Sequence, residues 1–207
     1  MTVPPVPPPT WARFCVEASA SPTFTTKVDR YRVEAVRTVS GAPLAGIAPG
    51  TRLVRMESIT ELPAGGGDLI GVTQHLAYTR AAERPDLVTS PLPGQDAVCV
   101  VIPLTKSAAW WQLALDEREA MFRGATRPGH VEVGLAYARI ILRKLYHCRS
   151  LPGAGWDFVT YFEFSPAHRP QFEALLAGLR DPEKNPEWNY VERESELWLS
   201  RVGTLVT

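Results

Sequence analysis

The second half of the chain constrains the fold most, because strand and helix patterns alternate there in a definite order. Residues 97–104 (AVCVVIPL) form a short, wholly apolar run typical of a buried strand. The elements expected after it are helical at 108–122 and 130–137, extended at 139–148 and 156–164, helical at 167–180, and extended within 187–201. The order βαββαβ predicts an α+β fold built on a ferredoxin-like unit.

The first half carries weaker patterns. Residues 1–10 contain five prolines and predict a proline-rich arm. Strand-like stretches are expected at 13–18, 27–36 and 68–80, a short helical piece from Ala81, and long loops within the Gly-, Pro- and Ala-rich segment 40–67. A break at 91–96 separates an incomplete N-terminal ferredoxin-like half, residues 11–93, from a C-terminal half, residues 94–207.

A single ferredoxin-like unit leaves one face of its sheet poorly covered. Pairing with a second sheet is therefore expected, and an incomplete first half makes a homodimer the economical solution. The sequence accordingly predicts a dimeric barrel with a truncated N-terminal half.

Composition limits the classes of partner. The 22 Lys and Arg balance the 22 Asp and Glu, so no overall field favours nucleic acid or an anionic membrane. No apolar run is long enough to span a membrane, and the N-terminus lacks the pattern of a signal peptide. Three scattered cysteines predict neither a disulfide framework nor a zinc site, and a cytoplasmic location is the default expectation.

The four histidines differ in context. His168 is expected at the surface, and His75 and His147 lie in strand-like segments where a structural histidine is the better interpretation. His130 opens a helical turn directly after a Pro-Gly break, without a second His or Cys at zinc-site spacing. The residues alone leave open whether it is structural or a lone axial ligand, which haem needs without any local motif.

Arg143 is the second unusual residue. In a strand over 139–148 it shares one face with Ile141, Leu145 and His147. An arginine among apolar neighbours is either an edge residue or ion-pair partner, or a buried cation that requires an anion. Both interpretations stay open at this stage.

Three segments carry a resemblance to a known family. IPLTKSAAWWQLALDEREAMF (102–122), RKLYHCRSLPGAGWDFVTYFEFSPAH (143–168) and EWNYVERESELWLSR (187–201) resemble the short-chain, dimeric branch of the chlorite dismutases. The match covers roughly the last 110 residues, is weaker over 71–79, and is not seen before residue 60. It implies a dimeric α+β barrel whose C-terminal half binds haem b.

The resemblance assigns roles to individual residues. His130 occupies the place of the proximal haem ligand, and Arg143, thirteen positions later, that of the distal arginine. Glu187, before Trp188, matches the carboxylate that hydrogen-bonds the proximal imidazole.

Three further residues are implied to contact the cofactor. Trp110 is expected in the wall of the haem pocket, and Lys106 and Tyr78 are expected as partners of the haem propionates.

The chemistry implied is the conversion of chlorite, the small anionic substrate, to chloride and dioxygen. It passes through a ferryl species and hypochlorite, which Arg143 would retain as a permanently charged donor. Glu187 would fix the tautomer of His130 and make it more electron-rich.

Three alternatives accompany this interpretation. They are a haem enzyme that uses peroxide or another small oxidant, a haem carrier or sensor without turnover, and a haem-free structural relative. The sequence also departs from the family before the ligand, at Arg127-Pro-Gly-His130, and in its proline arm. The coproheme decarboxylase branch typically has glutamine where Arg143 stands, so that activity is not expected.

Overall fold

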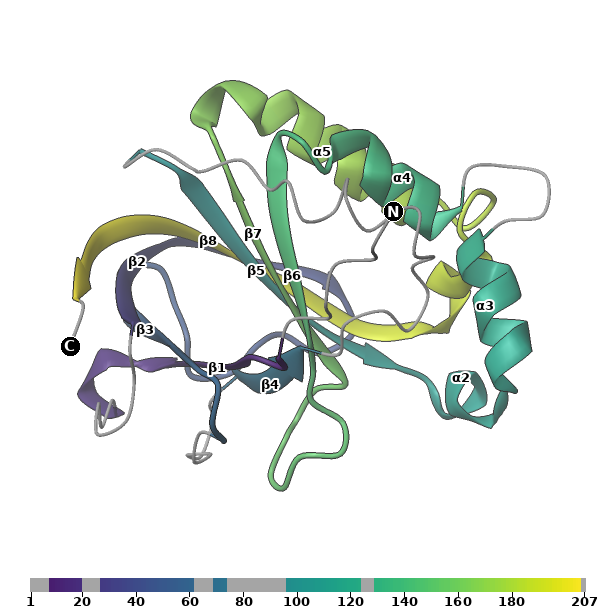
Figure 1. Cartoon of the computed structure of the whole chain (residues 1–207), viewed down its shortest axis with the longest axis horizontal. Coiled ribbons are helices and arrows are strands. Elements are labelled where there is room, and N and C mark those ends of the chain that lie inside the picture. Colours follow the sequence, from purple (N-terminus) through teal and green to yellow (C-terminus); the bar gives the residue numbers. More distant parts are fainter. Residues whose placement is uncertain (1–7, 20–26, 62–68, 74–95, 124–128, 206–207) are drawn as a thin grey trace.

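Antiparallel strands close into a barrel in the computed structural model, which describes residues 8–19, 27–61, 69–73, 96–123 and 129–205. The strands follow one another around the barrel in the order β1-β3-β2-β8-β5-β7-β6-β4. Figure 1 shows α4 and α5 covering one side of the barrel, with strands β1, β3 and β4 on the opposite side.

The C-terminal half forms the predicted ferredoxin-like unit. Its elements are β5 (Val98–Lys106), α2 (Ala108–Gln112), α3 (Leu115–Arg123), α4 (His130–Tyr137), β6 (Ile141–His147), β7 (Phe158–Phe164), α5 (Arg169–Leu179) and β8 (Val191–Leu205), with short 3-10 turns η3 (Pro166–His168) and η4 (Pro186–Tyr190). The strands lie in the order β8-β5-β7-β6, which places the first and third strands of the unit at its centre. The α+β prediction is confirmed.

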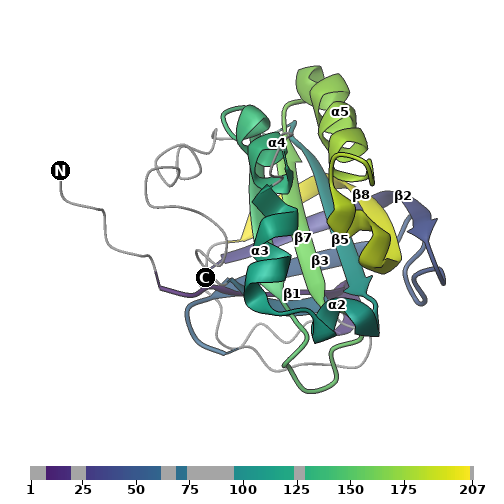
Figure 2. The same ribbon diagram turned by 90° about the vertical axis from the view of Figure 1, so that its right-hand side faces the viewer.

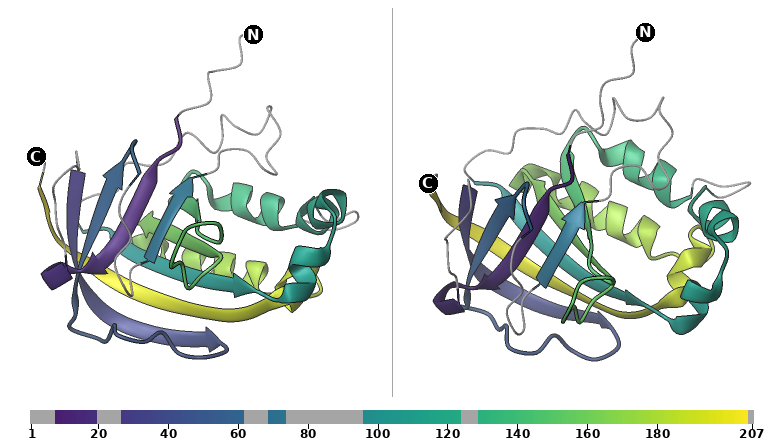
Figure 3. Two further views of the ribbon diagram at one scale, coloured as in Figure 1. Left: turned by 90° about the horizontal axis from the view of Figure 1, so that it is seen from below. Right: turned by 60° about the horizontal axis from the view of Figure 1, so that its bottom comes forward.

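The N-terminal half has the same strand order without the helices. Its elements are β1 (Trp11–Val16), the 3-10 turn η1 (Glu17–Ser19), β2 (Lys27–Ser40), β3 (Arg52–Ser58) and β4 (Leu69–Thr73). Their order β4-β1-β3-β2 repeats that of the other half, and no α-helix occurs among the described residues of this half. The ladders β2–β8 and β4–β6 join the halves, and the two views of Figure 3 show the strands curving round to meet.

Two local expectations were wrong. Strand β3 lies inside 40–67, where loops were expected, because the positive φ of Gly50 (89°) turns the chain back onto β2 in front of it. The helix expected over 108–122 is divided into α2 and α3, because Leu113 is extended (ψ 143°). Oε2 of Glu117 then accepts the backbone N–H of Ala114 at 2.7 Å, which caps the second helix at its start, Leu115. The helical piece expected from Ala81 lies outside the described residues.

Side chains alternate between the barrel interior and an outer core beneath the helices. Tyr146 of β6 and Tyr161 of β7 belong to the interior cluster, whereas Ile141 and Phe162 belong to the cluster packed against α5. Arg143 is the register partner of Phe162 and therefore lies on the outer face, on the side of the helices. Figure 2 shows α2, α3 and α4 following one another beside that face. No helix of the described residues is long and apolar enough to span a membrane.

The seam between β4 and β6 depends on a glycine. A Cβ atom on Gly71 would lie 2.7 Å from Cβ of Tyr146 and 2.9 Å from Sγ of Cys148, both buried in the barrel. We expect Gly71→Ala to lower the free energy of unfolding by about 1–3 kcal/mol through overpacking. Gly203→Ala on β8 is the matched control, because its Cβ would meet no atom within 4 Å. Denaturant unfolding of both variants checks this, and equal stabilities would contradict it.

Candidate active site

His130 is held at the first turn of α4. Gly129 precedes the helix, and its N–H donates to Oε2 of Glu132 at 3.0 Å, which fixes the start of α4. The imidazole is mostly buried, with 18% of its side chain exposed. It therefore lies between α4 and the outer face of the sheet, in one defined orientation.

Glu187 fixes the tautomer of that imidazole. It lies in η4 before β8, is buried, and accepts a hydrogen bond from Nδ1 of His130. Burial opposes ionisation of Glu187, but the hydrogen bond from His130 and the ammonium of Lys106 hold the pKa of the carboxyl below its ordinary value. Burial lowers the pKa of His130, so at pH 7 the ring is neutral, carries its proton on Nδ1, and presents a lone pair on Nε2.

Lys106 completes a buried chain of three polar side chains. Its ammonium donates to Oε2 of Glu187 at 2.6 Å and to the Glu187 carbonyl oxygen at 3.0 Å. It also lies 4.7 Å from the ring centroid of Trp110. Lys106 was expected to bind a haem propionate. The structure places its ammonium beside Glu187, whose charge it compensates, and the contact with a propionate stays a prediction.

Arg143 approaches the other ring nitrogen. Its Nη2 donates to Nε2 of His130 at 2.9 Å, which requires the same tautomer that Glu187 imposes. Its Nε is buried and has no hydrogen-bond partner. Burial lowers the pKa of this guanidinium, although it remains charged at neutral pH. A cation with an unsatisfied donor thus faces the only lone pair that the imidazole offers.

Aromatic rings enclose the imidazole. Phe122 of α3 meets the His130 ring edge-on with centroids 5.1 Å apart, and Trp110 of α2 packs against Phe122 at 5.6 Å and Tyr190 at 5.5 Å. Trp110 is only 2% exposed. Trp110 thus packs beside the Lys106 ammonium, and its role in the wall of a haem pocket stays a prediction. Tyr78 lies outside the described residues.

The comparison with known proteins identifies the family. The sequence model of the chlorite dismutases matches residues 52–200. The chain belongs to the chlorite dismutase family. A chlorite dismutase from Ideonella dechloratans is 29% identical over 154 residues, covering 72% of this chain and 50% of the relative. The chain therefore spans about half the length of that curated relative.

Solved structures of chlorite dismutases also resemble this chain. A dimeric chlorite dismutase from Nitrobacter winogradskyi is 31% identical, with a TM-score of 0.71, and the match covers 92% of this chain and 99% of that one. The chlorite dismutase from Candidatus Nitrospira defluvii, in its complex with imidazole, has a TM-score of 0.63 over 94% and 90% of the two chains. At 20% identity, the second match supports the fold alone.

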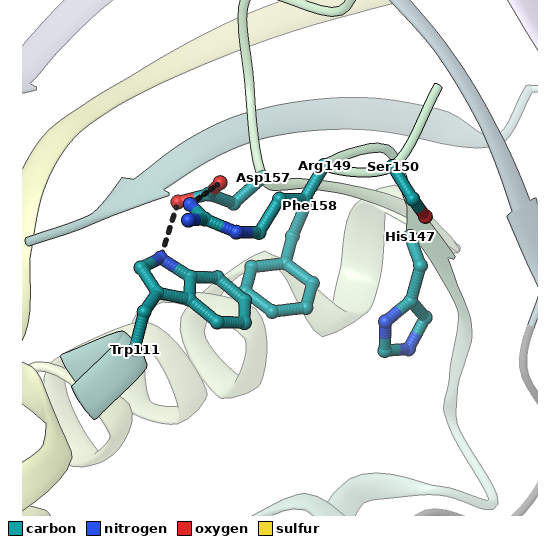
Figure 4. A pocket seen from close by; sticks show the side chains of 6 residues that line it. All are labelled: Trp111, His147, Arg149, Ser150, Asp157 and Phe158. Atoms are coloured by element: carbon teal, nitrogen blue, oxygen red, sulfur yellow. Dashed lines mark hydrogen bonds and ion pairs between the residues drawn. The ribbon is translucent and has the colours of Figure 1, made fainter. Parts of the chain in front are cut away.

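A pocket of about 340 Å³ lies at the end of β6 and β7, on the same side of the sheet as Arg143. The residues lining it are Trp111, His147, Arg149, Ser150, Asp157 and Phe158 (Figure 4). Trp111 stacks on Phe158 with centroids 5.9 Å apart, and the Arg149 guanidinium lies 4.1 Å from the Trp111 ring. Burial lowers the pKa of His147, so this second imidazole is neutral.

Sequence reasoning missed three residues of this site. Phe122 and Tyr190 escaped notice because an aromatic residue at helical or turn spacing is usually interpreted as core. Asp157, directly before β7, carries no sequence signal of its role, and it is only 5% exposed. The described residues contain no cluster of three His, Cys, Asp or Glu side chains able to hold a metal ion.

Proposed function

We propose that this protein binds haem b through Nε2 of His130 and converts chlorite to chloride and dioxygen, with Arg143 binding the anion. The observation that carries the proposal is the arrangement of the imidazole. Nδ1 is bound to a buried, ionised carboxylate, and Nε2 keeps its lone pair and faces a guanidinium. Such a carboxylate–histidine pair is a recurrent device for fixing a metal ligand.

The surrounding residues fit a flat, apolar, iron-containing cofactor. Leu145 and Thr160 are register partners on the outer face of the sheet beyond Arg143, and they are only half-buried, unlike Phe162 and Phe164 beneath α5. The unpaired Nε of Arg143 adds a donor for an anion at the same place. One imidazole, an apolar face and an unsatisfied cation together match the requirements of a haem with a small oxyanion.

Haem, when bound, supplies the redox-active iron at which chlorite is decomposed. The chain's own residues then have distinct tasks. Glu187 orients His130 and makes the imidazole more electron-rich, and Lys106 limits that effect by neutralising part of the carboxylate charge. Nε2 of His130 would hold the iron, and the Arg143 guanidinium, which donates to Nε2 in this structure, would bind chlorite and retain hypochlorite.

Replacing Glu187 with glutamine tests whether this carboxylate makes the His130 imidazole more electron-rich. A neutral amide accepts the Nδ1 proton more weakly, so the imidazole stabilises ferric iron less. We expect the ferric/ferrous midpoint potential of Glu187→Gln to rise by on the order of 60 mV, a tenfold change in the redox equilibrium. Spectroelectrochemical titration measures it. Glu173→Gln on the exposed face of α5 is the control, and an unchanged potential in Glu187→Gln would remove the carboxylate from this role.

We further propose that the protein is a homodimer. The Nitrobacter relative is described as dimeric, and it matches nearly the whole of both chains. Light scattering coupled to size-exclusion chromatography measures the mass of the assembly. A mass of one chain, 22.9 kDa, would contradict this proposal.

Oxygen release decides the activity. Purified protein supplied with haem b is mixed with chlorite, and dissolved oxygen and chloride are measured. One dioxygen and one chloride per chlorite is the expected result. Haem uptake with turnover of peroxide but not chlorite would favour a peroxidase-like enzyme, and haem uptake without either reaction would favour a carrier or sensor. Protein that takes up no haem would overturn the proposal.

A further inference from the structure

Asp157 is a buried carboxylate that the proposed function leaves without a task. It lies directly before β7, where the β6–β7 hairpin returns to the sheet, and is 5% exposed. Its backbone is fixed on both sides. The Asp157 N–H donates to the carbonyl of Leu104 at 3.0 Å, and its carbonyl accepts the N–H of Cys148 at 2.9 Å. The side chain is therefore held at one point between β5 and the hairpin.

Both carboxylate oxygens of Asp157 are engaged. Oδ2 accepts the backbone N–H of Lys106 at 2.7 Å and Nε1 of Trp111 at 3.3 Å, and Oδ1 accepts Nη1 of Arg149 at 3.1 Å. Figure 4 shows the bonds from Trp111 and Arg149 converging on this carboxylate. Charge-assisted bonds of this kind are stronger than those between neutral groups.

The bond to Lys106 falls where the sheet becomes irregular. Strand β5 runs in register with β8 up to Thr105, and the register shifts between Thr105 and Lys106. The backbone N–H of Ser107 then donates to the carbonyl oxygen of Tyr190 at 2.8 Å, and α2 begins at the next residue. The ladder is irregular at such a bulge, and the bond from Lys106 to the Asp157 carboxylate adds a fixed point to the backbone there.

From that position the Lys106 side chain reaches Glu187 with two hydrogen bonds. We propose that Asp157 is a positioning residue that holds Lys106 against Glu187 and thereby limits the electron-rich character of His130. This inference rests on the proposed function, because it concerns the imidazole proposed to bind iron. It extends the chain His130–Glu187–Lys106 by one residue, whose side-chain partners are Lys106, Trp111 and Arg149.

The sign of the effect separates this role from general damage to the site. Without Asp157, the Lys106 ammonium moves away from Glu187, and the carboxylate retains more negative charge. The imidazole then gains anionic character and stabilises ferric iron, so the midpoint potential falls. Glu187→Gln changes the potential in the opposite direction.

The first measurement uses the protein without haem. A buried, hydrogen-bonded ammonium exchanges its protons slowly, so Lys106 is expected to give a ¹⁵N-ammonium NMR signal that Lys106→Met removes. In Asp157→Ala we expect this exchange to be at least about tenfold faster, the equivalent of losing one charge-assisted hydrogen bond. Arg149→Ala is the matched control, because it removes a half-exposed partner of Asp157 and leaves the bond to Lys106. Unchanged exchange in Asp157→Ala would overturn the proposal.

The second measurement uses the haem-loaded protein. We expect a lower midpoint potential in Asp157→Ala, a smaller decrease in Asp157→Asn, whose amide oxygen still accepts the Lys106 N–H, and little change in Arg149→Ala. In the Lys106→Met background neither Asp157 variant should shift the potential further. A shift that persists in that background would overturn the proposal. If Asp157→Ala does not fold, Asp157→Leu, which has a similar size and no acceptor for the Lys106 N–H, replaces it in both measurements.

The outcomes of this test and of the proposed function are distinct. Parent protein that takes up no haem ends the proposed function, whereas the NMR measurement still decides whether Asp157 positions Lys106. Parent protein that binds haem while Asp157→Ala leaves both the exchange and the potential unchanged ends the present inference alone.

Discussion

His130→Ala is expected to abolish the Soret spectrum of histidine-ligated haem after reconstitution. Nδ1 of the ring is bound to Glu187, and Nε2 presents its lone pair on the opposite side. Loss of a partner behind a metal ligand costs about 10–100-fold in affinity, so loss of the ligand itself should exceed about 100-fold.

Two controls make this result specific. His147→Ala removes an imidazole from the same strand face as Arg143, and His168→Ala removes one at the start of α5. Both variants should bind haem like the parent. Free imidazole added to His130→Ala should restore a ligated spectrum, because Glu187 and Lys106 remain to receive it. An unaltered spectrum in His130→Ala would exclude the residue as the ligand.

Arg143→Ala is expected to retain haem but to be inactivated rapidly by chlorite. A charged hydrogen bond to the anion is worth about 1.5–3 kcal/mol, and tenfold in binding corresponds to about 1.4 kcal/mol. Hypochlorite should therefore escape about 10–100-fold more readily, and the number of turnovers before the haem bleaches should fall in proportion. Oxygen release, haem absorbance and a hypochlorite-sensitive dye, followed together, measure this.

The graded variant distinguishes charge from geometry. Arg143→Lys keeps the positive charge but loses the planar fork, so we expect an intermediate number of turnovers. Arg169→Ala, an exposed arginine at the start of α5, is the control for general loss of positive charge. If Arg143→Ala consumes chlorite as durably as the parent, the guanidinium does not retain the oxidant.

Local patterns predicted most of the C-terminal half. The apolar run before Lys106, the amphipathic helix around Phe172 and the β-branched segment around Arg143 each appear where expected. The predictions failed at Leu113, where one extended residue divides a helix, and at β3, which a single turn at Gly50 brings back to β2. Periodicity averages over several residues and therefore misses a change in backbone direction at one of them.

The residues of the candidate site were likewise predicted only in part. Resemblance of ordered motifs marked His130, Arg143 and Glu187, and the structure brings all three together. The resemblance also implied a propionate contact for Lys106, which stays a prediction. Its observed partner, Glu187, lies 81 residues away, and no local pattern indicates it. Asp157 gave no signal at all, since its partner at Lys106 is 51 residues away.

The sequence by itself determined the order of strands and helices, and with it the face of β6 on which Arg143 lies, because these follow from the period of the side chains. Tertiary structure alone decided that the Lys106 ammonium bonds Glu187 and that Asp157 bonds the backbone of Lys106. It also decided that the Arg143 guanidinium bonds Nε2 of His130. The physical reason is distance along the chain. These hydrogen bonds join residues up to 81 positions apart, and their directions are set by strand register, a bulge and a short turn that no local pattern specifies.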